Sequence, residues 1–109
     1  METKKSDILF SIELDNNHVP EKIKWSAEDG GVNEQETKAT LISVWDDKKM
    51  EALRVDLWTK DMPMDHMKRF IHQIFLSLAN TYERATNDKN VADSITEFAE
   101  KYAKESKIK

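Results

Sequence analysis

The sequence predicts an α+β fold, a four-stranded antiparallel meander followed by two C-terminal helices that pack on one face of the sheet. Before Pro63, β-branched and aromatic residues alternate with polar ones, as in half-buried strands. After Pro63, apolar residues recur every three or four positions, as in amphipathic helices. Because the chain has 109 residues, we expect a single domain over residues 1–109, with strands within 7–60, helices within 63–105 and frayed termini.

Four strands are expected in the first part, separated by residues that favour turns. The segment from Pro20 onward suits a strand start or a sheet edge, because proline cannot donate a hydrogen bond to the ladder. Gly30 and Gly31, the two glycines of the chain, lie in the turn between the second and third strands. Short connections between consecutive strands imply antiparallel pairing. The expected strands are Ile8 to Leu14, Val19 to Ala27, Thr37 to Trp45 and Glu51 to Lys60.

The last two strands form a hairpin whose register can be predicted. Opposed residues of an antiparallel pair share a face, so a loop of even length keeps apolar residues together. A loop of two or four residues centred between Asp47 and Lys48 sets Ile42 opposite Leu53 and Thr40 opposite Val55. The second face then holds Leu41, Trp45, Met50 and Trp58, interrupted by Arg54 and Asp56.

This second face is too apolar for an ordinary solvent-facing sheet. Two tryptophans are costly to leave in water, so a protein partner or a second subunit is as plausible a cover as this chain's own segments. We therefore predict a candidate interaction surface and a homo-oligomer, most simply a two-fold dimer that covers this face. The residues of the candidate surface are Leu41, Trp45, Met50 and Trp58.

Two helices are expected in the second part. Pro63 suits a first helical turn, and an apolar stripe follows from Met67 to Ala85. The first helix should stop near Thr86, because Asn87-Asp88 offers an N-cap for the second. The residues predicted to form the core of the whole domain are Ile12, Leu14, Ile42, Leu53, Val55, Leu57, Phe70, Ile74, Leu78 and Phe98.

Composition excludes several classes of function. The net charge is −4, which argues against nucleic-acid binding, since that requires clustered cations. There is no cysteine, so disulfides, thiolate metal sites and thiol catalysis are excluded. The longest apolar run, Ile74 to Leu76, is too short to insert into a membrane, and the N-terminus does not resemble a signal peptide. We expect a cytoplasmic protein.

No catalytic, cofactor-binding or metal-binding constellation is recognisable. His66 and His72 lie about 240° apart around one helix and cannot jointly hold a metal, and His18 lies in a turn. The acidic residues mostly flank predicted turns, which does not make a general acid–base pair. Neither a phosphate-binding glycine loop nor a nucleophile elbow is present. The sequence therefore predicts that the protein is not an enzyme and needs no cofactor.

Several stretches of the chain carry a family resemblance. The most specific is the segment from Leu53 to Pro63, and supporting segments are Phe10 to Asp15, Val19 to Trp25, Ser43 to Asp46 and Tyr82 to Thr86. From about Ser6 to Tyr102, the chain resembles GldC, a small gliding motility protein family of the Bacteroidota. The resemblance implies a soluble cytoplasmic accessory of gliding motility with no known catalytic activity, and it transfers no active-site residues.

Three hypotheses from different classes remain open. The leading one is a non-catalytic protein-interaction module of gliding motility. The second is a chaperone or secretion adaptor that binds unfolded polypeptide, because four antiparallel strands followed by two helices resemble the architecture of the export chaperone SecB. The third is a small-ligand-binding protein or enzyme, which requires a deep pocket with convergent polar groups.

Overall fold

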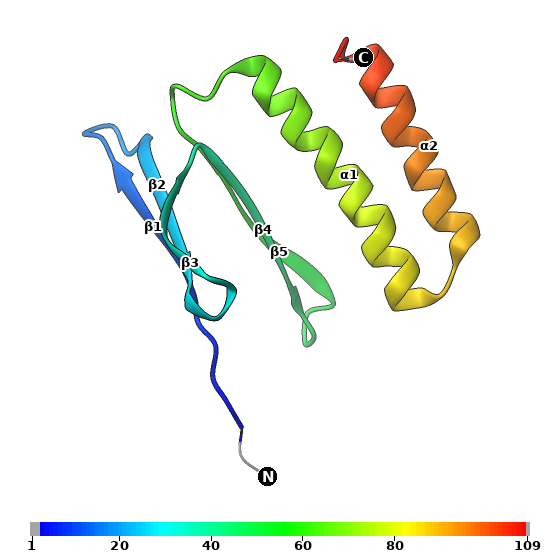
Figure 1. Ribbon diagram of the computed structural model, residues 1–109, viewed down its shortest axis with the longest axis horizontal. Coiled ribbons are helices and arrows are strands. Elements are labelled where there is room, and N and C mark those ends of the chain that lie inside the picture. The colour runs from blue at the N-terminus through cyan, green and yellow to red at the C-terminus, as the bar shows by residue number, and fades with distance from the viewer. Residues whose placement is uncertain (1–2, 109) are drawn as a thin grey trace. The chain divides into compact units, whose positions relative to one another are not determined.

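The computed structural model describes residues 3–108 and divides into two compact units (Figure 1). The first unit, made of strands, ends at Met62, and the second, made of two helices, begins at Pro63. This boundary coincides with the change of periodicity in the sequence, and the order of elements confirms the α+β class. The predicted packing of both helices on one face of the sheet would be a contact between the two units, and it stays a prediction.

The first unit contains five strands in two antiparallel sheets, where the sequence predicted four strands in one. The first sheet has the order β1-β2-β3, and the second is a hairpin of β4 and β5. Lys38 forms the bend between the two sheets, and a short 3-10 turn, η1 (Glu28–Gly30), precedes β3. The strands are β1 (Ile8–Leu14), β2 (Pro20–Ala27), β3 (Val32–Thr37), β4 (Ala39–Asp46) and β5 (Glu51–Trp58).

The core of the first sheet lies on β2. Ile23 is fully buried and lies opposite Ile12 of β1, and Phe10 stacks on Trp25 with ring centroids 6.1 Å apart. Five of the predicted core residues are substantially exposed within their own units: Leu14, Leu53, Val55, Leu78 and Phe98. The other five predicted core residues are half-buried. For Leu53 and Val55 the reason is that no second layer among the described residues of the first unit covers either face of the β4–β5 hairpin.

A polar corner joins the two sheets where β5 ends. The backbone N–H of Thr59 donates to the carbonyl of Lys38 at 2.8 Å, and that of Lys60 donates to the carbonyl of Pro20 at 3.3 Å. The Lys60 ammonium also lies 2.7 Å from a carboxylate oxygen of Asp15. This hydrogen bond, together with the N–H of Val19, lowers the pKa of Asp15 to about 2, while Asp15 and Glu21 raise the pKa of Lys60.

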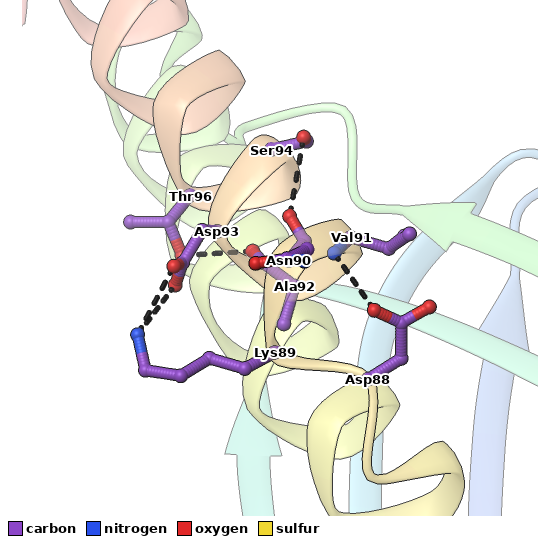
Figure 2. A network of polar contacts seen from close by, with 8 residues as sticks. All are labelled: Asp88, Lys89, Asn90, Val91, Ala92, Asp93, Ser94 and Thr96. Carbon is purple, nitrogen blue, oxygen red and sulfur yellow. Dashed lines mark hydrogen bonds and ion pairs between the residues drawn. The ribbon is translucent and has the colours of Figure 1, made fainter.

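The second unit is an antiparallel helical hairpin of α1 (Met64–Thr86) and α2 (Lys89–Glu105). α1 ends in a left-handed residue, Asn87, whose N–H donates to the carbonyl of Glu83. Asp88 caps α2, because its carboxylate accepts from the N–H of Val91 at 3.1 Å (Figure 2). The predicted boundary between the helices is therefore confirmed.

The two helices meet through small residues and an aromatic cluster. Tyr102 stacks on His72, contacts Phe75 edge-on, and donates its hydroxyl to the carbonyl of Lys68 at 3.1 Å. Alanine side chains permit close approach of the two backbones at the buried positions Ala79, Ala92, Ala99 and Ala103.

The face of α1 that contacts α2 is therefore not the predicted apolar stripe. Ile74 and Leu78 each precede a residue of the observed contact face, so they lie about 100° around the helix from it. They instead line a shallow groove of about 400 Å³ along α1, with Phe70, Gln73, Ser77 and Thr81. Leu78 is therefore not covered by α2 and is exposed within the second unit.

Candidate interaction surface

The β4–β5 hairpin, which carries the predicted surface, has a register two residues away from the predicted one. Ile42 lies opposite Val55 and Thr40 opposite Leu57. The reason is a four-residue loop, 47–50, between the closing pair Asp46 and Glu51. One carboxylate oxygen of Asp46 accepts from the N–H groups of Lys48 and Lys49 at 3.0 and 3.2 Å, which centres the turn one residue later than expected.

Because the shift is by two residues, every residue that lies in a strand keeps the face that the sequence predicted. We define the aliphatic face of the hairpin as Thr40, Ile42, Val44, Leu53, Val55 and Leu57. We define the tryptophan face as Ala39, Leu41, Ser43, Trp45, Ala52, Arg54, Asp56 and Trp58. Every residue on each face is opposite another residue of the same face.

Three of the four predicted surface residues lie on the tryptophan face, and all four are exposed. Trp45 is 59% exposed and Trp58 is 54% exposed, but they lie at opposite ends of the hairpin, opposite Ala52 and Ala39 respectively. Ala52, the residue opposite Trp45, lies six residues before Trp58 on β5, so the two tryptophans are about 20 Å apart along the strands. Arg54 and Asp56 lie between them, so the tryptophans do not form one patch within a single chain.

Met50, the fourth predicted residue, lies in the loop rather than on the tryptophan face. Its φ of 55° is left-handed, and its side chain is 69% exposed. Strand alternation cannot assign such a residue to either face. Met50 therefore extends the exposed apolar surface beyond the end of the ladder.

The aliphatic face is a second exposed apolar surface that the sequence reasoning missed. Leu53 and Val55 are each 48% exposed, and Val44 is more exposed still. The alternation identified these residues as a common apolar face but assigned them to the core. The sequence pattern does not show which layer covers such a face, and no second layer among the described residues of the first unit covers this one.

The histidines and acidic residues show no metal-binding arrangement in the part of the chain that the structure describes. His18 lies in a turn with φ 61°, His66 is exposed, and His72 stacks on Tyr102. The Nε2 atom of His72 is buried and has no hydrogen-bond partner among the described residues. Within residues 3–108, no group of three or more histidine or acidic side chains is arranged to hold a metal ion.

The length and polarity of the helices, and the similarity of the chain to known protein families, indicate what kind of protein this is. No helix among the described residues is long and apolar enough to cross a membrane. The chain matches the family described as "Gliding motility-associated protein GldC-like" over residues 20–108, which is most of its length. The chain belongs to the GldC-like family. This membership associates it with gliding motility, and the family is not known to be enzymatic. Searches among curated proteins and among solved structures each give no match.

Proposed function

We propose that this member of the GldC-like family is a non-catalytic cytoplasmic protein of gliding motility that acts by binding another protein. Its binding surface consists of Leu41, Trp45, Met50 and Trp58. The observation that carries the proposal is the exposure of Trp45 and Trp58 on one face of the hairpin. Together they leave about 200 Å² of largely apolar surface in water, and its burial contributes on the order of 5 kcal/mol before the costs of association.

The proposal is tested by gliding of cells that carry altered copies of this protein. Replacing Trp45 and Trp58 with Ser should impair gliding, while circular dichroism of the purified protein shows an unchanged fold. Ile8→Ser is the matched control, because Ile8 is equally exposed but lies on β1, away from the surface. Replacing His18, His66 and His72 together with Gln should leave gliding unchanged. Loss of gliding with the histidines and its retention without the tryptophans would refute the interaction proposal.

A second candidate function is a SecB-like chaperone or secretion adaptor that binds unfolded polypeptide. The observation that favours it is the extent of exposed apolar surface, which includes both faces of the hairpin and the groove on α1 lined by Phe70, Ile74 and Leu78. The test is aggregation of an unrelated denatured protein in the presence of stoichiometric amounts of this chain. Suppression of aggregation favours the chaperone, and binding only to a defined protein from gliding cells favours the motility adaptor.

A further inference from the structure

The outer edge of β5 carries main-chain groups that point away from its only neighbour. The N–H of Thr59 donates to Lys38, its directly opposed residue, so the odd-numbered residues of β5 exchange hydrogen bonds with β4. The N–H and C=O groups of Ala52, Arg54 and Asp56 consequently point outward. Among the described residues, the sheet ends at β5, and these three residues make no backbone hydrogen bond outside the hairpin.

The side chains along this edge have a self-complementary charge pattern. The sequence Leu53-Arg54-Val55-Asp56-Leu57 carries one cation and one anion at equal distances from Val55. If a second copy pairs antiparallel along this edge with Val55 opposite Val55, each Arg54 lies opposite Asp56 of the other copy. Opposite charges on directly opposed residues stabilise a sheet, and like charges destabilise it.

The neighbouring registers lack this complementarity. Centring the pair on position 54 sets two arginines directly opposite each other, and centring it on position 56 does the same with two aspartates. Pairing an outward-pointing residue with an inward-pointing one cannot form the ladder. We propose that two copies of this chain associate through antiparallel pairing of β5 with β5, centred on Val55.

This dimer would increase the stability of the β4–β5 hairpin, which is a sheet of only two strands. An isolated two-stranded hairpin is only marginally stable, and independent stability requires three or more strands with an apolar face or packing against a helix. Pairing gives a sheet of four strands with the order β4-β5-β5-β4. On its aliphatic face, Val55 adjoins Val55 and Leu53 adjoins Leu57 of the second copy, so the exposed aliphatic residues form continuous rows across the sheet.

The same pairing assembles the tryptophans. Ala52 lies opposite Trp45 within the chain and opposite Trp58 of the second copy. The two indoles then flank the small Ala52 side chain, two strand spacings or about 10 Å apart at their backbones, instead of about 20 Å within one chain. The dimer itself is independent of the proposed function; the use of these tryptophan pairs to bind another protein rests on that function.

Single cysteines test the register directly, because the natural chain contains none. In this register, the two Val55 residues form a non-hydrogen-bonded pair with Cα atoms about 4.5 Å apart, a separation that a disulfide can bridge. Val55→Cys should therefore give a covalent dimer under mild oxidation. Leu53→Cys is the control, because the two Leu53 residues are separated by about 13 Å along the strands. The absence of a Val55→Cys dimer, or equally fast cross-linking of Leu53→Cys, would overturn the proposal.

Analytical ultracentrifugation tests the charge pairs. The wild-type chain of 12.7 kDa should sediment at twice its mass at micromolar concentration. Arg54→Asp should weaken the dimer at least tenfold, and the combined R54D/D56R exchange should restore it. Lys48→Asp makes the same charge change in the loop, off the edge, and should leave the dimer intact. A monomeric wild type, or an R54D dimer as tight as the wild type, would overturn the proposal without affecting the gliding experiment on Trp45 and Trp58.

Discussion

Ile23 provides a quantitative test of the packing of the first sheet. It is the largest fully buried side chain among the described residues and lies on β2, the central strand. Ile23→Ala removes three carbon atoms, which at about 0.8 kcal/mol each gives roughly 2.4 kcal/mol in transfer free energy. The cavity that remains adds to this loss, so we expect the free energy of unfolding to fall by about 3–4 kcal/mol.

Ile8→Ala is the matched control, since the same atoms are removed from β1 of the same sheet. Ile8 is 63% exposed, so we expect a loss of at most about 1 kcal/mol, mainly from reduced strand propensity. Urea unfolding followed by tryptophan fluorescence, at one protein concentration, measures both variants. Equal losses would refute the assignment of Ile23 as core and Ile8 as surface, and a larger loss at Ile8 would indicate that this edge is covered in solution.

Two further predictions concern the polar contacts. The lowered pKa of Asp15 stabilises the fold above about pH 4, and this contribution is lost as the pH falls toward 2; the urea midpoints of wild type and Asp15→Asn should therefore differ at pH 7 and converge near pH 2. Midpoints that stay equally far apart at both pH values would exclude this linkage. Asp88→Ala removes the N-cap of α2 and should lower the free energy of unfolding by about 1 kcal/mol. Asp93→Ala, which breaks only the exposed pair with Lys89, should lower it by no more than about 0.5 kcal/mol in the same denaturation assay.

The features that could be predicted from the sequence are those set by local chemistry. The change from strands to helices at Pro63, the end of α1 at Thr86 and the cap at Asp88 all depend on residues within a few positions. The faces of the strand residues were also predicted correctly, because side-chain alternation in a strand is local, but Met50 was wrongly placed on one of these faces. The exact register of β4 and β5 was not predicted correctly. It depends on where the turn is centred, and the sequence does not show that the carboxylate of Asp46 accepts hydrogen bonds from Lys48 and Lys49.

The features that were missed depend on main-chain hydrogen bonds between strands or on which face of a helix contacts the neighbouring helix. β3 is mostly polar, and as an edge strand it is held by hydrogen bonds to β2 rather than by an apolar face. On α1, periodicity identified the broad stripe through Ile74 and Leu78 but not the face that contacts α2. That face passes through His72, Phe75 and Ala79, and its selection depends on the alanines of α2, which have little weight in a hydrophobicity pattern.

The exposed faces of the hairpin and the free edge of β5 have a common physical origin. A hairpin with alternating side chains buries one face only when a second layer covers it, and it satisfies its outer main-chain groups only when another strand pairs with them. Pairing of two β5 strands would provide those hydrogen bonds and use the charges of Arg54 and Asp56, but it would leave both faces of the enlarged sheet available. Dimerisation and partner binding therefore use different parts of the same element. Arg54→Asp should act first on the oligomeric state, and replacement of Trp45 and Trp58 should act on partner binding in a chain that still forms dimers.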